Sequence, residues 1–132
     1  MRPPGPTATV PEDAVQVRVM LADVHGIARS AIAALLQSLD GVELVGEAGA
    51  RHDLAAALRR GRPEVLILDE RLLGSAEHVL SGLGPRSQPV RVIVIGMDDD
   101  PVFAERARQR GAYAWVAKDR AADDLPSLLE DL

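Results

Sequence analysis

One stretch of the sequence limits the folds open to this chain more than any other: four consecutive apolar residues, 65–68, followed at once by Asp69. Val, Leu and Ile without polar alternation predict a strand that is covered on both faces, as in a parallel sheet. Such strands bring their last side chain to the carboxyl edge of the sheet, where open α/β folds bind ligands. Asp69 is therefore predicted to lie in a binding crevice.

A second apolar segment, residues 15–22, also ends in a carboxylate, Asp23. In a doubly wound sheet with strand order 2-1-3-4-5, the first and third strands are neighbours. We therefore expect Asp23 and Asp69 to face each other across one crevice.

The rest of the chain alternates apolar segments with stretches of helical periodicity or helix-capping residues. The predicted strands are residues 15–22, 42–46, 65–69, 90–95 and 112–117. The predicted helices are residues 27–39, 53–60 (closed by Gly61), 76–83, 101–110 (capped by Asp and closed by Gly111) and 122–132. This alternation predicts an α/β fold, a flavodoxin-like three-layer (βα)5 sandwich with a doubly wound parallel sheet.

Length and composition narrow the function classes. A chain of 132 residues fits one domain, which we place at residues 15–132, after a proline-rich leader at 1–14 that we expect to be disordered. The net charge of -5, with acidic and basic residues interspersed, argues against nucleic-acid binding by this domain alone. The chain has no cysteine, which excludes disulfides and thiolate chemistry, and we find no signal peptide or membrane span. We expect a cytoplasmic protein.

Several short motifs, taken together and in this order, resemble the receiver domain of two-component response regulators. The most similar subfamily carries a LuxR-type helix-turn-helix behind the receiver. The motifs are Leu-Ala-Asp-Val-His at 21–25, Val-Gly-Glu-Ala at 45–48, Pro-Glu-Val-Leu-Ile-Leu-Asp at 63–69, Arg71, and the segment from Gly-Ala at 111–112 to Lys-Asp at 118–119. The resemblance covers nearly all of the receiver-like segment 15–132.

The resemblance implies a role for each matching residue. Asp69 matches the phosphoacceptor, Asp23 the first acid of a magnesium-binding pair, and Lys118 the lysine that ends the fifth strand. A backbone carbonyl near Arg71 would be a further magnesium ligand, and Trp115 stands at the aromatic switch position. Asp69 and Lys118 would carry the chemistry. We expect no enzyme activity beyond self-phosphorylation of Asp69 from a kinase or a small phosphodonor.

The sequence departs from the family pattern at three positions. The second acid is Val24, the hydroxyl residue that ends the fourth strand is Gly96, and the usual proline after the acceptor is Leu73. Mg²⁺ needs oxygen ligands, so we expect its binding to be weak or absent and no cofactor to be required. Loss of a hydroxyl that would bond the charged phosphoryl group removes about 1.5–3 kcal/mol. Phosphorylation would then drive the switch only weakly, because a ligand shifts an equilibrium through contacts that differ between states.

We therefore interpret the chain as an atypical, pseudo-receiver domain that acts by protein association. Its partners would be a second copy in a homodimer or an attached LuxR-type DNA-binding domain used in transcription control, with a histidine kinase as a further candidate. The chain ends inside its last predicted helix, so we expect the native protein to continue past Leu132. Two alternatives stay open: a working Mg²⁺-dependent phospho-receiver using Asp69, and a small-molecule sensor whose ligand fills the crevice.

Three side chains near the crevice have competing interpretations. Lys118 is the single lysine of the chain, and it could meet a phosphoryl group or pair with Asp69 in an unphosphorylated fold. For Trp115 we favour packing in an edge strand over a switching role. The three histidines are too scattered for a metal site, and His25, which lies beside the crevice, is expected to be solvated.

Overall fold

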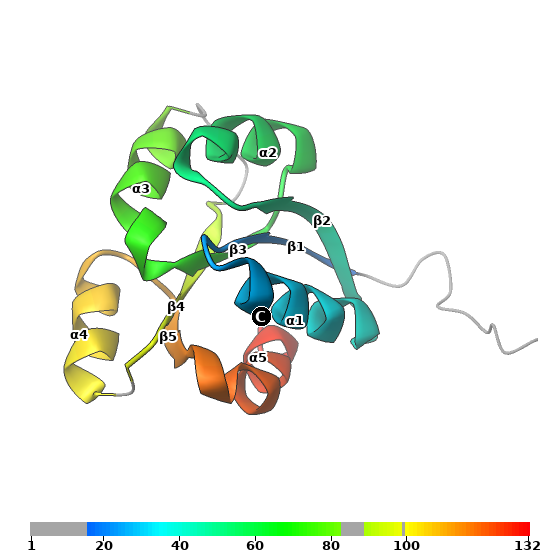
Figure 1. The fold of residues 1–132 in the computed structure, drawn as a ribbon, viewed down its shortest axis with the longest axis vertical. Helices are drawn as coiled ribbons and strands as arrows, with labels where there is room; N and C mark the ends of the chain where they lie inside the picture. Colours follow the sequence, from blue (N-terminus) through cyan, green and yellow to red (C-terminus); the bar gives the residue numbers. More distant parts are fainter. Residues whose placement is uncertain (1–15, 83–88, 99) are drawn as a thin grey trace, which may run out of the picture.

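A computed structural model describes residues 16–82, 89–98 and 100–132 of the chain. Within these ranges, five parallel strands form one sheet in the order β2-β1-β3-β4-β5, as predicted (Figure 1). The strands are β1 (Val17–Ala22), β2 (Val42–Ala48), β3 (Val65–Asp69), β4 (Arg91–Gly96) and β5 (Ala114–Ala117). The predicted leader, residues 1–14, lies outside the described residues.

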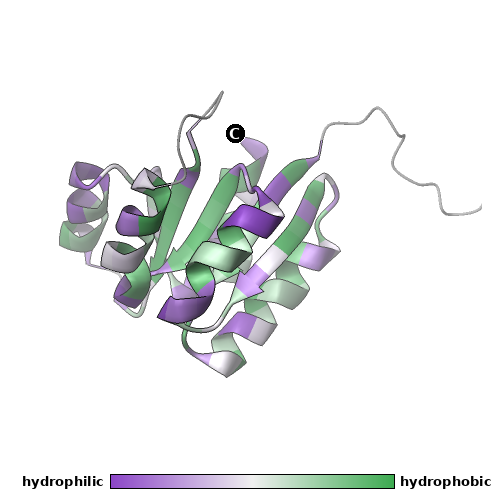
Figure 2. Ribbon diagram, turned by 90° about the horizontal axis from the view of Figure 1, so that it is seen from above, coloured by the Kyte–Doolittle hydropathy of each residue, from purple (hydrophilic) through white to green (hydrophobic). Residues whose placement is uncertain are grey.

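In the described part of the chain, five α-helices cover the two faces of the sheet (Figure 1). They are α1 (Gly26–Ser38), α2 (Leu54–Gly61), α3 (Leu73–Ser81), α4 (Pro101–Gln109) and α5 (Ala121–Glu130), with single 3-10 turns at Arg51–Asp53, Glu70–Leu72 and Lys118–Arg120. Helices α1 and α5 pack on one face, and α2, α3 and α4 pack on the other. The result is the predicted three-layer α/β sandwich, with its most apolar strands between the helices (Figure 2).

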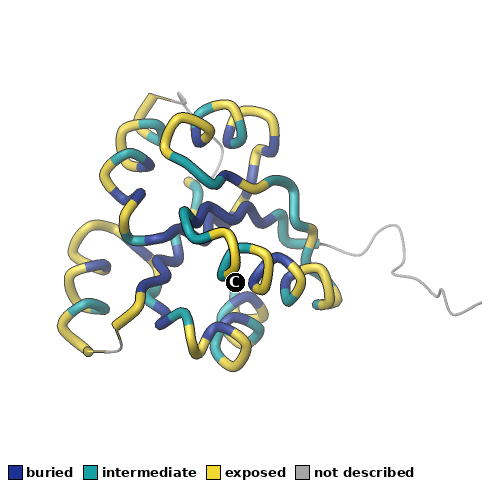
Figure 3. The backbone as a smooth tube through the Cα atoms, in the orientation of Figure 1, coloured by how far each residue is buried: buried dark blue, intermediate teal, exposed yellow. Residues whose placement is uncertain are grey.

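The unbroken apolar run of β3 explains why the fold has two cores. All five residues of β3 are buried, and alternate side chains point to opposite faces. Val65 and Ile67 join the core under α1 and α5, whereas Leu66 and Leu68 join the core under α2, α3 and α4. Strand β3 is accordingly buried along its whole length, and β1 and β4 are buried over their last four residues, whereas the helices bury one side only (Figure 3).

Two glycine predictions have different outcomes. Gly61 was expected to close α2, but it lies inside the helix, and Arg62 takes the left-handed conformation with φ 47°. Gly61 is needed for close packing instead, because a Cβ there would lie 3.2 Å from the Val45 side chain and from the Val45 carbonyl oxygen. Gly111 does close α4, with φ 90°, and Asp100 caps the same helix by accepting from the Val102 N–H.

Several predicted boundaries are wrong by a few residues; helix α5, for example, ends at Glu130 and not at Leu132. Helix α3 begins at Leu73 rather than at Ala76, because the 3-10 turn Glu70–Leu72 runs directly into it. The expected end of this helix, Leu83, lies outside the described residues. Strand β2 continues to Ala48, where its pairing with β1 persists past a register shift. Strand β5 begins at Ala114, two residues later than predicted.

No helix in the described ranges is both long and apolar enough to cross a membrane.

Candidate functional site

The structure brings the two predicted carboxylates together at the carboxyl edge of the sheet. Ala22 of β1 lies opposite Leu68 of β3, so the residues that follow them, Asp23 and Asp69, are neighbours. Their exposed fractions are 0% and 1%, and they are the only charged residues among those described that are buried. Two buried carboxylates this close need cationic or hydrogen-bonding partners.

Lys118 supplies the positive charge. It follows β5, and its ammonium Nζ lies 2.9 Å from Asp23 Oδ1 and 3.4 Å from Asp69 Oδ2. Its side chain is only 8% exposed, so the ion pairs lie out of bulk water. The pairing of Lys118 with Asp69 that the sequence left open is therefore present, and the shorter contact is to Asp23.

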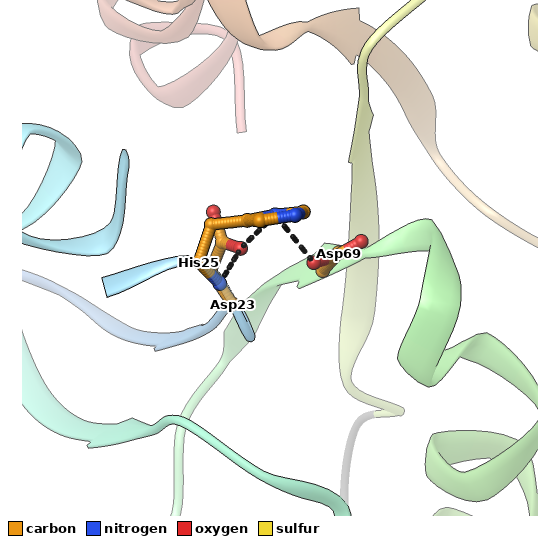
Figure 4. A group of neighbouring side chains, drawn as sticks. All are labelled: Asp23, His25 and Asp69. Atoms are coloured by element: carbon orange, nitrogen blue, oxygen red, sulfur yellow. Dashed lines mark hydrogen bonds and ion pairs between the residues drawn. The ribbon is translucent and has the colours of Figure 1, made fainter. Parts of the chain in front are cut away.

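His25 also belongs to this cluster, although its side chain is 39% exposed and so keeps part of the expected contact with solvent. Its Nδ1 lies 2.8 Å from Lys118 Nζ. The same atom lies 3.4 Å from Asp23 Oδ1 and 3.7 Å from Asp69 Oδ2 (Figure 4). The cause is local: Asp23 Oδ1 accepts from the backbone N–H of His25, two residues on, at 2.9 Å. The Asp-Val-His motif is a local signal for the position of the His25 backbone, whereas the direction of its ring depends on the contact with Lys118.

Asp69 is held in its charged form. Burial raises the pKa of this carboxyl group, but the N–H of Arg71, the Asp23 carboxyl group, the Lys118 charge and the N–H of Val24 together hold the pKa below its usual value. Oδ1 accepts from Arg71 at 3.0 Å, and Oδ2 accepts from Val24 at 3.3 Å. Asp69 is therefore an ionised carboxylate at neutral pH. Arg71 contributes its backbone N–H, and the residue itself is exposed.

Asp23 has one oxygen with no donor. Its Oδ1 accepts from His25 and Lys118, whereas its buried Oδ2 has no hydrogen-bond partner among the described residues. A buried acceptor without a partner costs about 1–3 kcal/mol. Such a group calls for a cation or an ordered water.

Beside Gly96, at the end of β4, the crevice is filled by packed side chains. A Cβ built on Gly96 would overlap the ring of Trp115, so this ring fills the space in which a side chain at position 96 would lie. The ring also stacks on Phe103 at 5.4 Å, and its Nε1 donates to the Asp98 carbonyl oxygen at 3.0 Å. Trp115 is thus a packed residue of an edge strand, as expected.

The donor set fits Mg²⁺ poorly. Val24 packs its side chain against the core under α2, α3 and α4 and offers the site only its backbone N–H. The groups that could hold an ion are Asp23, His25 and Asp69, whose ligand atoms lie within 4.8 Å of one another. One of these three donors is a nitrogen, whereas Mg²⁺ selects oxygen ligands. Lys118 also competes with any ion for both carboxylates.

The sequence of the chain is similar to the sequences of bacterial response regulators. No protein-family model matches the chain. The probable transcriptional regulatory protein NarL of Mycobacterium tuberculosis is 31% identical over 120 residues, which are 88% of this chain and 54% of that protein. The response regulator GacA of Pseudomonas aeruginosa is 26% identical over 110 residues, 83% of this chain and 51% of that protein. The chain thus spans about half the length of these curated relatives.

Solved structures agree with the fold and with these relatives. The signal receiver domain of the putative response regulator NarL from Mycobacterium tuberculosis superposes with a TM-score of 0.72 at 27% identity. The match covers 89% of this chain and 95% of that domain. The aligned part therefore corresponds to a whole receiver domain in a solved structure.

Proposed function

Because this chain belongs to the receiver domains of LuxR/NarL-type response regulators, we propose that it is a pseudo-receiver, whose switch is set by packing and not by phosphorylation. It acts by associating with a second copy of the chain or with an attached effector domain. The observation that carries this proposal is the contact of Trp115 with Gly96. With the ring in the space of the missing side chain, no hydroxyl at position 96 can respond to a phosphoryl group on Asp69.

The charged side of the crevice supports the same proposal. Lys118 already forms ion pairs with both carboxylates and is nearly buried, so the charged groups of the crevice have partners without a phosphoryl group. Val24 removes an oxygen ligand from the place where Mg²⁺ would be held. The site thus keeps the carboxylates and the lysine of a phosphoacceptor centre. It lacks the hydroxyl group at position 96 that would respond to phosphorylation.

In the full protein, we propose that this domain regulates an attached DNA-binding domain in transcription control, in the cytoplasm. The relatives are about twice as long as the matched segment, and one of them is a probable transcriptional regulatory protein. A histidine kinase would be a partner only if Asp69 accepts a phosphoryl group from it. The domain itself, with a net charge of -5, would not contact DNA.

A second function, a working phospho-receiver, is favoured by one observation. Asp69 is ionised, buried and next to Lys118, which is the state a nucleophilic carboxylate requires. Sensing of a small molecule would use the same crevice, where Lys118 and His25 already contact both carboxylates.

One experiment separates these functions. The chain is incubated with acetyl phosphate and Mg²⁺, and both the intact mass and the oligomeric state by light scattering are measured, with Asp69→Asn as control. We expect an oligomeric state that does not change, whether or not a phosphoryl increment is found. A mass increment that is lost in Asp69→Asn, together with a change of oligomeric state, would establish the phospho-receiver instead. A thermal-shift screen of small molecules tests the sensor.

A further inference from the structure

We propose that Asp23, His25 and Asp69 form a Zn²⁺ site, which binds this ion in preference to Mg²⁺ through two carboxylates and the imidazole Nδ1. The inference goes beyond the proposed function and does not depend on it. It concerns the ion that the crevice selects, whether or not Asp69 is ever phosphorylated.

The three groups already converge on a single cationic centre. The ammonium of Lys118 lies 2.9 Å from Asp23 Oδ1, 2.8 Å from His25 Nδ1 and 3.4 Å from Asp69 Oδ2. A group with a positive charge is therefore held by the same three side chains that would ligate a metal ion. The donors come from the end of β1, the start of α1 and the end of β3, so the sheet edge keeps them together before any ion arrives (Figure 4).

A second observation points to a cation independently. Asp23 is fully buried, and its Oδ2 has no hydrogen-bond donor in the described part of the chain. Lys118 therefore leaves the acceptor capacity of this carboxylate partly unused. A metal ion, or a water bound to it, can satisfy the remaining oxygen, whereas Lys118 at Oδ1 does not.

Charge and ligand type favour a divalent ion other than Mg²⁺. Two carboxylates and one ammonium leave a net charge of minus one, whereas a divalent ion that displaces the ammonium neutralises both carboxylates. Imidazole nitrogen suits Zn²⁺, and Mg²⁺ selects oxygen ligands. Zn²⁺ often takes three protein ligands plus water. The His25 side chain is 39% exposed, so its ring borders solvent, from which that water can come.

The test is calorimetric titration of the untagged 132-residue chain with ZnCl₂ and, separately, MgCl₂, without a phosphodonor. The key variant is His25→Ala. Its matched control is His52→Ala, since His52 also lies beside an aspartate, Asp53 at 3.5 Å, but its side chain is 84% exposed and far from the cluster in sequence. Circular dichroism checks that each variant is folded.

We expect one Zn²⁺ per wild-type chain, bound more tightly than Mg²⁺. His25→Ala should weaken Zn²⁺ binding by about tenfold or more, because even loss of an outer partner of a ligand commonly costs that much. His52→Ala should bind Zn²⁺ as the wild type does. Equal Zn²⁺ affinities in the two histidine variants, or an Mg²⁺ affinity that matches that for Zn²⁺, would overturn the proposal.

A second variant tests the displacement of the ammonium. Lys118→Met keeps the length of the side chain and removes its charge, so Zn²⁺ should raise the melting temperature of this variant more than that of the wild type. A smaller rise would contradict the site. These titrations contain no phosphodonor, so their failure leaves the pseudo-receiver proposal intact, and a phosphorylation-driven switch would leave the Zn²⁺ result intact.

Discussion

The two halves of the crevice are built from different kinds of interaction. The charged half consists of Asp23, His25, Asp69 and Lys118, which meet at the ends of β1, β3 and β5 within hydrogen-bond distance. The packed half consists of Gly96 and Trp115, where a ring fills the volume of an absent side chain. In this chain the cluster of charged groups and the packed ring therefore occupy different parts of the crevice. The charged half depends on contacts between a few charged atoms. The packed half depends on the fit of the Trp115 ring into the space beside Gly96.

The largest effect should come from breaking the charged half. Lys118→Met leaves two buried carboxylates without their cation, and removal of one partner of a buried ion pair commonly costs about 3–5 kcal/mol. The free energy of unfolding, measured in urea at neutral pH without added metal, should fall by this amount. Arg120→Met is the matched control, because Arg120 pairs with Asp124 on the surface, where such pairs contribute about 0–1 kcal/mol. Similar losses in the two variants would contradict a buried ion-pair cluster.

Overfilling the packed half should cost somewhat less. Gly96→Thr places a side chain where the Trp115 ring lies, and overpacking commonly costs about 1–3 kcal/mol. In a double-mutant cycle with Trp115→Ala, the cost of Gly96→Thr should largely disappear, because the smaller side chain vacates the space. Additive losses of unfolding free energy would show that the two positions do not compete for one volume.

Replacing Val24 by an acid tests whether the charged half and the packed half of the crevice are independent. Val24→Asp adds a carboxylate at the position of the family's second acid, and ligand charge should raise the affinity for Mg²⁺ by about tenfold or more. Titration calorimetry measures this directly, with Val24→Asn as an uncharged control. After treatment with acetyl phosphate, the variant should still keep its oligomeric state, because the packed half is unchanged. A change of oligomeric state in this variant would show that the two halves are coupled.

The smallest effect concerns acid stability. The pKa of Asp69 is lowered on folding, so its contribution to stability is full above the ordinary pKa of 3.8 and is lost as the pH falls through the lower folded value. Asp69→Asn removes this contribution, and its unfolding free energy should fall less steeply than that of the wild type below about pH 4. Urea unfolding at a series of acidic pH values tests this, and identical slopes would contradict it.

Much of the fold and part of the site could be predicted from the sequence. The apolar run before Asp69 predicted a strand buried on both faces, and that strand and its neighbour β1 bring Asp69 beside Asp23. The family resemblance pointed to Lys118, which lies in the same cluster. Helix ends were harder to predict. Arg62, and not Gly61, takes the left-handed conformation after α2. Gly61 lies where it packs closely against Val45, which local sequence preference does not show.

By itself, the sequence determined the order of the strands and the edge at which the carboxylates meet, because burial of apolar strands and the rules of parallel-sheet connection act along the chain. Only the tertiary structure decided that His25 turns toward Lys118 and that Trp115 fills the space beside Gly96. His25 and Lys118 are 93 residues apart in the sequence. Gly96 and Trp115 lie on the neighbouring strands β4 and β5. The geometry of both contacts follows from how volumes and charges fit in three dimensions, which no local pattern of residues encodes.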